Sequence, residues 1–191
     1  MATVIEAVTE PPEGYELIDG VPVEPPPMSA YAAAIANRLN VELVLYGRQT
    51  GLGQSMMDMF FRVPLREDRY RVRKPDVAFV SFDRWPADRP ISYRGNPLPV
   101  IPDLMVEVAS PTDEAEELLK KAYQYLRAGS RLVWVVFPAN RTLFAYTTPT
   151  SVRVFSDADT LDGGDVLPGF QLPLAVLFPP ATDLPEEKDD E

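Results

Sequence analysis

The chain contains several short apolar runs, bounded by proline, glycine or charged residues, with the length and composition of buried strands. Residues 104–109 and 132–137 are almost continuously apolar, which is typical of strands buried on both faces of a sheet. Residues 70–80 first alternate polar and apolar positions and become wholly apolar after Asp76, as expected for a strand that enters the centre of a sheet. Further strands are predicted over residues 54–63, 141–147 and 152–155, and in a closing segment, 167–178.

Two segments, residues 30–46 and 113–128, carry the periodicity of amphipathic helices. Each follows a serine suited to the N-cap and precedes a glycine suited to end a helix. These residues are Ser29 and Gly47 for the first helix, and Ser110 and Gly129 for the second. The small residues Ala32, Ala33 and Ala34 would let the first helix pack closely against a sheet.

An Asp-Gly pair at residues 19–20 lies between two apolar-alternating arms and predicts a β-hairpin near the N-terminus. A chain of 191 residues is expected to form one domain, which we assign to residues 13–180. Residues 1–12 are interpreted as a flexible start, and the acidic segment 181–191 as a disordered tail.

The chain has neither cysteine nor histidine, which excludes Ser-His and Cys-His nucleophile systems and zinc sites built from those residues. Any metal ion must therefore be held by oxygen ligands, as Mg²⁺, Mn²⁺ and Ca²⁺ are. No apolar run approaches the roughly 20 residues that span a bilayer, and the first residues do not resemble a signal peptide. We expect a cytoplasmic protein without a membrane segment.

Two of the predicted strands each carry a carboxylate, Asp76 and Glu107, in apolar surroundings. A buried charge is costly unless it is paired or binds a metal. The second helix follows with Lys120 and Lys121, and helical geometry favours Lys121 narrowly as the lysine that points back at the sheet. Taken singly, each residue fits a structural role, in which Asp76 caps a turn, Glu107 pairs with an arginine and both lysines are solvated. Taken together, they favour metal-dependent hydrolysis of a phosphodiester.

The formal net charge of −11 argues at first against a nucleic-acid partner. Residues 1–37 hold six acids and no base, and residues 183–191 hold six acids and one base, so these ends account for −6 − 5 = −11. Within the neutral body, residues 62–74 are rich in arginine and lysine, which suits an anionic substrate. We predict Arg71, Arg73 and Lys74 as substrate-binding residues, although a solvated hairpin arm would have the same composition.

Pro75-Asp76 followed by Glu107-Val108-Ala109 resembles the PD-(D/E)XK nuclease signature, with Ala109 in place of its lysine. More specifically, the chain resembles the Uma-type family of restriction endonucleases, in which the lysine lies on the next helix, four residues before a tyrosine. In this sequence that lysine is Lys121, before Tyr125. The resemblance extends over residues 13–178 and includes, among others, the segments 15–20, 74–80, 103–111, 125–129, 133–136 and 165–170.

The resemblance implies a restriction-endonuclease-like, three-layer α/β/α fold with a central mixed sheet and the N-terminal hairpin. It also implies Mg²⁺ or Mn²⁺ as cofactor, DNA as substrate and often a homodimer. Asp76, Glu107 and Lys121 would be catalytic, and we predict that Asp76, Glu107 and the Val108 carbonyl hold the metal. Relatives often carry a histidine near the start of the first long helix, which this chain lacks, so no role is assigned to residues 29–31.

Two functions of other classes remain open from the sequence. A binding or assembly module that kept the nuclease fold without activity would explain the acidic ends, which repel DNA. A glycosidase would use two carboxylates but has no role for the lysine or the arginine cluster. The complete set of Asp76, Glu107 and Lys121 favours the endonuclease.

Overall fold

The computed structural model describes residues 9–92 and 96–180, and a six-stranded mixed sheet lies at its centre. Its strands are in the order β10-β9-β8-β7-β6-β3; β7 and β8 are parallel, and the other neighbours are antiparallel. The strands are β3 (Gly53–Met57), β6 (Val77–Ser81), β7 (Leu104–Val108), β8 (Leu132–Phe137), β9 (Thr142–Thr148) and β10 (Ser151–Ser156). The predicted flexible start up to residue 8 and the predicted tail from residue 181 lie outside the described residues.

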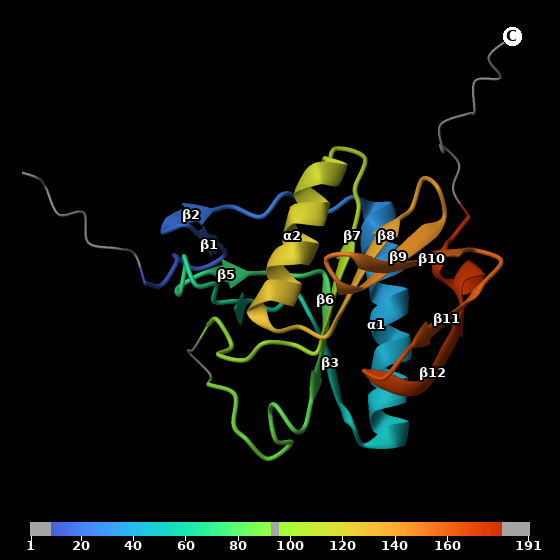
Figure 1. The fold of residues 1–191 in the computed structure, drawn as a ribbon, viewed down its shortest axis with the longest axis horizontal. Helices are drawn as coiled ribbons and strands as arrows, with labels where there is room; N and C mark the ends of the chain where they lie inside the picture. The colour runs from blue at the N-terminus through green and yellow to red at the C-terminus, as the bar shows by residue number, and fades with distance from the viewer. Residues whose placement is uncertain (1–8, 93–95, 181–191) are drawn as a thin grey trace, which may run out of the picture.

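One long helix packs on each face of this sheet, which confirms the predicted three-layer α/β/α architecture (Figure 1). Helix α1 (Ala30–Thr50) packs on the face that carries Leu104, Val106 and Trp134. Helix α2 (Ala115–Ala128) packs on the opposite face, beside Met105 and Val133. Because α2 connects the parallel strands β7 and β8, the chain crosses from one strand to the other over this second face. Within the described ranges, no helix is long and apolar enough to cross a membrane.

Two smaller sheets flank the main one. The first has the order β2-β1-β5-β4 and is formed by β1 (Glu16–Ile18), β2 (Val21–Val23), β4 (Phe61–Arg62) and β5 (Val72–Arg73). Asp19 and Gly20, with φ of 51° and 77°, form the turn between β1 and β2, which confirms the predicted hairpin. The second sheet is the hairpin of β11 (Thr160–Gly163) and β12 (Leu167–Pro173), followed by the 3₁₀ helix η1 (Leu174–Leu177).

The predicted strands over residues 54–63 and 70–80 are each divided in two. The first breaks at Asp58, whose φ of 55° does not fit a strand. The second breaks at residues 74–76, where Pro75 lacks the N–H that a central ladder needs. As a result, β5 belongs to the small N-terminal sheet and β6 to the main sheet. Asp76 lies at this crossing, directly before β6.

Two predicted helix boundaries are wrong. Helix α1 continues past Gly47 to Thr50 and ends at Gly51, in the left-handed region with φ of 67°. A Cβ at Gly47 would lie 2.5 Å from the carbonyl oxygen of Gly53, so this glycine allows close packing and does not end the helix. Helix α2 begins at Ala115, and Ser110 instead accepts a hydrogen bond from the Ser29 N–H at 3.1 Å through its hydroxyl.

Candidate active site

The register of β6 and β7 brings Asp76 and Glu107 to the same face of the sheet. Val77 lies opposite Val106, so Asp76 and Glu107, one residue outward on each strand, lie side by side. Two hydrogen bonds fix Asp76: its N–H donates to the Val106 carbonyl at 3.0 Å, and its carboxylate accepts from the Val108 N–H at 2.6 Å. Both carboxylates therefore lie on the face that α2 covers.

The electrostatic environment of Asp76 disfavours its charged form. Burial raises the pKa of its carboxyl group to about 7, and the negative charge of Glu107 adds to this shift. The hydrogen bond from Val108 and the charge of Lys121 act in the opposite direction. Two neighbouring carboxylates repel each other, and a divalent cation between them would relieve this repulsion.

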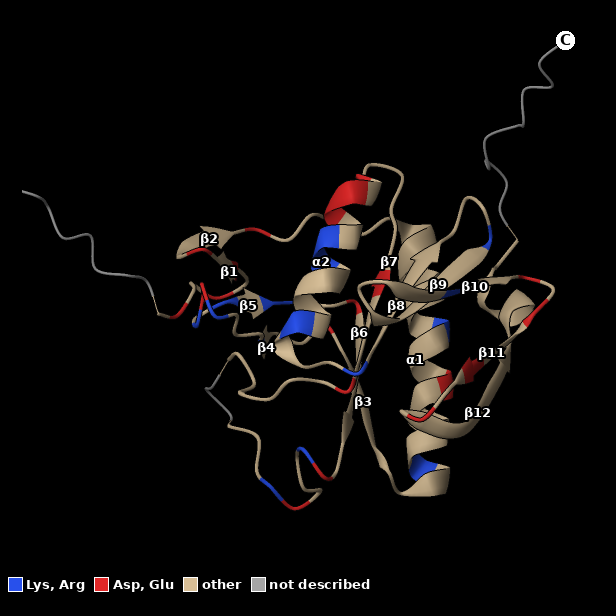
Figure 2. Cartoon of the chain, in the orientation of Figure 1, with Lys and Arg blue, Asp and Glu red and all other residues tan. Residues whose placement is uncertain are grey.

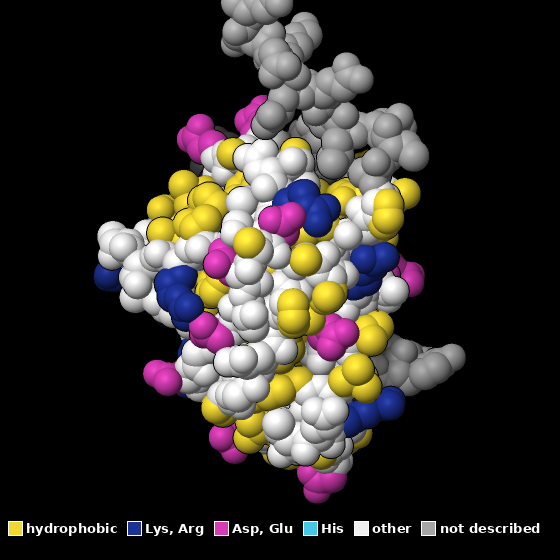
Figure 3. Space-filling view, turned by 90° about the vertical axis from the view of Figure 1, so that its right-hand side faces the viewer, with side chains coloured by type: hydrophobic (Ala, Val, Ile, Leu, Met, Phe, Trp, Pro, Cys, Tyr) yellow, Lys and Arg dark blue, Asp and Glu magenta, His cyan; other side chains and the backbone are white. Residues whose placement is uncertain are grey.

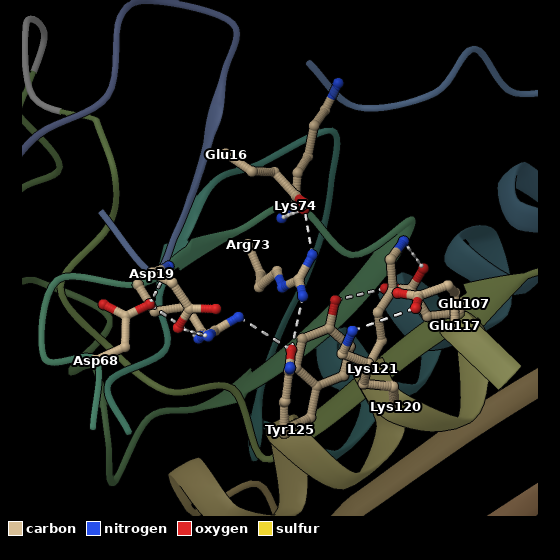
Figure 4. A network of polar contacts seen from close by, with 12 residues as sticks. Glu16, Asp19, Asp68, Arg73, Lys74, Glu107, Glu117, Lys120, Lys121 and Tyr125 are labelled. Carbon is tan, nitrogen blue, oxygen red and sulfur yellow. Dashed lines mark hydrogen bonds and ion pairs between the residues drawn. The ribbon is translucent and has the colours of Figure 1, made fainter. Parts of the chain in front are cut away.

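Glu107 is buried, and both of its carboxylate oxygens are held by side chains of α2 (Figure 4). Its Oε2 accepts from the Lys121 ammonium at 2.9 Å, and its Oε1 accepts from the Tyr125 hydroxyl at 2.5 Å. Lys121 and Tyr125 are four residues apart, which places them on the same face of the helix. One turn of α2 thus supplies both partners of the buried carboxylate.

The two neighbouring lysines of α2 point in different directions. Lys121 is largely buried, and Glu107 raises the pKa of its ammonium although burial alone would lower it. Lys120 is exposed and pairs with Glu117 at 3.2 Å, one turn earlier on the same helix. The structure therefore agrees with the expectation, taken from helical spacing, that Lys121 is the lysine directed at the sheet.

Arg71 and Arg73, which are expected to contact the substrate, have side chains that are buried in ion pairs. Arg73 is 4% exposed and donates to Glu16 at 2.8 Å. Arg71 is 2% exposed and pairs with Asp19 at 2.7 Å and Asp68 at 3.2 Å. These two side chains are thus part of the interior beside the site, and a contact with substrate stays a prediction for them.

Both arginines also connect helix α2 to the N-terminal sheet through hydrogen bonds to Gln124. The Gln124 side-chain oxygen accepts from Arg73 at 2.6 Å and from Arg71 at 3.3 Å. Glu16 bonds the Lys74 N–H at 2.8 Å in addition to Arg73. The arginines thus form a buried support directly beside the site (Figure 4).

Lys74, the third predicted substrate residue, is half-buried and nearer to the surface than the two arginines. Its ammonium forms an ion pair with the exposed Asp58 and lies 5.5 Å from the centre of the Phe60 ring. The start of α2 carries Glu116 and Glu117, so acidic side chains lie at the end of α2 nearest the connection from β7 (Figure 2). Of the three cations predicted to bind substrate, Lys74 is the one that is not buried.

The β10–β12 side of the molecule has a mixed charge pattern. Arg141 pairs with Asp157 at 2.6 Å, and Arg153 pairs with Asp162 at 2.7 Å. Figure 3 shows this side with acidic and basic side chains scattered among apolar ones. The pattern does not form the continuous basic band that is typical of a surface for duplex DNA.

The donor set lies where β6 begins and β7 ends, and it fits Mg²⁺ or Mn²⁺. It offers the carboxylates of Asp76 and Glu107 and the Val108 carbonyl, which points to the same edge of β7 as the Val108 N–H bonded to Asp76. All three are oxygen ligands, which these ions prefer. Among the described residues, no three His, Cys, Asp or Glu side chains converge as a metal cluster, so a carbonyl and water would complete the shell.

Three contact residues of the site were not predicted from the sequence. The helical periodicity predicts Tyr125 on the buried stripe beside Lys121 but gives it no role at the site, and it gives none to Glu16 or Gln124. The four-residue spacing from Lys121 to Tyr125 was a usable signal, because it places the hydroxyl on the same helical face. Glu16 and Gln124 meet Arg73 across 57 and 51 residues of sequence, and local patterns do not reveal such contacts.

The fold is similar to the crystal structure of a putative nuclease belonging to DUF820 from Anabaena variabilis, with a TM-score of 0.73 and 18% sequence identity. The alignment covers 86% of this chain and 89% of that one, and at this identity it establishes the fold. The family model of Uma2, described as a putative restriction endonuclease, matches residues 4–175. The chain therefore belongs to the Uma2 family. No curated protein matches it.

Proposed function

We propose that this protein is a metal-dependent endonuclease that hydrolyses phosphodiester bonds in DNA. The observation that carries the proposal is the meeting of three groups at one point. Asp76 and Glu107 share one face of the sheet, and the Lys121 ammonium lies 2.9 Å from Glu107. The description of the Uma2 family as restriction endonucleases also supports phosphodiester hydrolysis.

Each group of the site has a distinct part in this reaction. Asp76, Glu107 and the Val108 carbonyl would hold Mg²⁺ or Mn²⁺, which when bound supplies positive charge to the phosphoryl oxygen and the attacking water. Lys121 would place its ammonium beside that water and neutralise charge that develops at the phosphate. The buried ion pair of Arg73 and Glu16 holds Gln124 of α2, three residues after Lys121, against the N-terminal sheet.

We further propose that DNA approaches the edge of the sheet where β6 begins and β7 ends, and that it meets Lys74 there. In this proposal Arg71 and Arg73 support helix α2 from inside the protein. The homodimer and the cytoplasmic setting implied by the family resemblance are kept as parts of this proposal. The acidic start of α2 favours one other candidate, a nuclease-fold module without activity, because Glu116 and Glu117 repel a phosphate backbone.

The test is nicking of supercoiled plasmid in Mn²⁺ by the native protein and by two asparagine variants. Asp76→Asn removes a proposed metal ligand and should abolish cleavage, whereas Asp83→Asn should cleave normally. Asp83 is exposed and follows the opposite end of the same strand, β6, so it controls for the loss of one acid. A native protein that binds Mn²⁺ and DNA but leaves the plasmid intact would favour the inactive module.

A further inference from the structure

The hydroxyl of Tyr125 makes an unusual contact for a fully buried tyrosine, because its partner is a carboxylate. Its 2.5 Å hydrogen bond to Glu107 Oε1 is at the short end of the range for an O–H donor. Tyr46 of α1, which is also buried, donates to the neutral Pro168 carbonyl at 3.1 Å. A phenol hydroxyl is a hydrogen-bond donor, and here it serves one oxygen of the carboxylate while Lys121 serves the other.

The two groups that hold Glu107 differ in freedom. Tyr125 is 0% exposed, and its ring lies in the core between α2 and the sheet. The Lys121 side chain is 19% exposed, and its ammonium is carried by a flexible four-carbon stem. When a cation approaches Glu107, the ammonium at Oε2 can move aside, whereas the phenol at Oε1 has no room to leave.

The turn of α2 that bears Tyr125 is itself held in place. The adjacent Gln124 accepts hydrogen bonds from Arg73 at 2.6 Å and Arg71 at 3.3 Å. Arg73 is in turn paired with the buried Glu16, and Arg71 with the buried Asp68 and the exposed Asp19. The phenol is therefore fixed by packing around its ring and by hydrogen bonds along its helix.

We propose that Tyr125 is a positioning residue that holds one oxygen of Glu107 and directs the other toward the divalent cation. The inference rests on the metal-dependent function proposed above. An ionised carboxylate has about four lone-pair sites, and Tyr125 occupies one of them while it stops rotation of the group. A ligand that is already oriented loses less freedom when the cation binds, and outer-shell partners of this kind strengthen metal binding.

The test compares Mn²⁺ binding by Tyr125→Phe and Tyr123→Phe, measured by calorimetry. Tyr125→Phe keeps the buried ring and removes only the hydroxyl, and its dissociation constant for Mn²⁺ should rise about tenfold or more. Tyr123 lies on the same helix with its ring 6.3 Å from that of Tyr146, and its variant should bind Mn²⁺ within about twofold of the native protein. Plasmid nicking by Tyr125→Phe should recover in excess Mn²⁺, since the residue acts through the metal ligand.

The outcomes separate this inference from the proposed function. Equal Mn²⁺ affinity of native protein and Tyr125→Phe would overturn the role of Tyr125 and leave the endonuclease proposal standing. The expected loss of affinity in a protein that never cleaves DNA would support Tyr125 and overturn the endonuclease. A native protein that binds no Mn²⁺ would overturn both.

A second measurement needs no variant and decides the inference if Tyr125→Phe fails to fold. In native protein labelled with ¹³C at the tyrosine ring, the Tyr125 Cζ resonance should shift on addition of Mg²⁺, because its partner becomes a metal ligand. The resonance of Tyr46, on the opposite face of the sheet, should stay in place. A Tyr125 resonance that does not respond at saturating Mg²⁺ would overturn the proposal.

Discussion

Helices α1 and α2 cover opposite faces of the same sheet, and their buried residues differ in kind. The buried positions of α1 are Ala32, Ile35, Ala36, Leu39, Leu43, Tyr46 and Gly47. Those of α2 are Leu118, Ala122, Gln124 and Tyr125, with Lys121 largely enclosed beside them. The α1 face is thus apolar apart from the Tyr46 hydroxyl, while the α2 face encloses several polar groups that are costly to bury. Such a cost is typical of a functional site.

The largest effect on stability is expected for the charges beneath the α2 face. Arg73→Ala would leave Glu16 buried without its cation, and we expect the free energy of unfolding to fall by about 4 kcal/mol. Arg69 is exposed on the same chain segment. Arg69→Ala should therefore change the free energy of unfolding by less than about 0.5 kcal/mol. Urea denaturation of both variants measures the difference. Equal stability of the two would mean that Arg73 and Glu16 do not pair in solution.

A comparable loss is expected on the α1 face, with a different consequence for the site. Leu39 is fully buried, and Leu39→Ala should lower the free energy of unfolding by about 3 kcal/mol through loss of contacts and a cavity. Of the proposed metal-holding residues, only Val108 has its side chain on this face, and its carbonyl points along the sheet. Mn²⁺ affinity at a temperature where the variant is folded should therefore equal that of the native protein. A matching loss of Mn²⁺ affinity would show that the two faces are coupled.

A smaller effect, with a defined pH dependence, is expected from Asp76. Its pKa of about 7 in the folded protein lies above the ordinary value of about 4, so the folded state binds more protons between these two values. In metal-free protein this group therefore lowers stability as pH rises from about 4 to about 7. Asp76→Asn cannot ionise, so its stability relative to the native protein should rise across this window by an amount on the order of 3 kcal/mol.

Thermal or urea unfolding in EDTA at pH 4, 6 and 8 measures this difference. Asp83→Asn serves as the control and should run parallel to the native protein at all three pH values. If the curve for Asp76→Asn also ran parallel, Asp76 would have an ordinary pKa and would not be held against Glu107 as the structure shows.

The smallest effect is expected at the surface. Lys74 is the most accessible of the three cations predicted to bind substrate, and Lys74→Ala should weaken DNA binding and reduce the slope of log K against log [salt] by about one. Arg66 is exposed in the loop between β4 and β5, and Arg66→Ala is the matched control for a lost positive charge. An unchanged slope for Lys74→Ala would place the DNA on another surface.

The sequence predicted those parts of the molecule that follow from local periodicity. Strand parity places Glu107 on the face opposite to Leu104, Val106 and Val108, and helical spacing separates Lys121 from Lys120, because each rule concerns neighbours along one element. The hairpin at Asp19-Gly20 was predicted for the same reason, since its turn depends on two adjacent residues.

The burial of Arg71 and Arg73 could not be predicted in this way. Their alternation with Tyr70 and Val72 is the pattern of an exposed arm, and it says nothing about what covers the polar face. That cover consists of Glu16, from the N-terminal hairpin, and Gln124, from α2, each about 50 residues away. The division of residues 70–80 into β5 and β6 was missed because both halves are extended and only their partners differ.

The most direct test of the catalytic site is a comparison of Lys121→Ala and Lys120→Ala in nicking of supercoiled plasmid with Mn²⁺. The two residues are adjacent on α2 and identical in type, but only Lys121 contacts Glu107. Lys121→Ala should cut at least about 100-fold more slowly than the native protein while it keeps its circular dichroism spectrum and Mn²⁺ affinity. Lys120→Ala should cut at the native rate. Cleavage by Lys121→Ala at the native rate, or an equal loss in both variants, would contradict the assignment of Lys121 to the reaction.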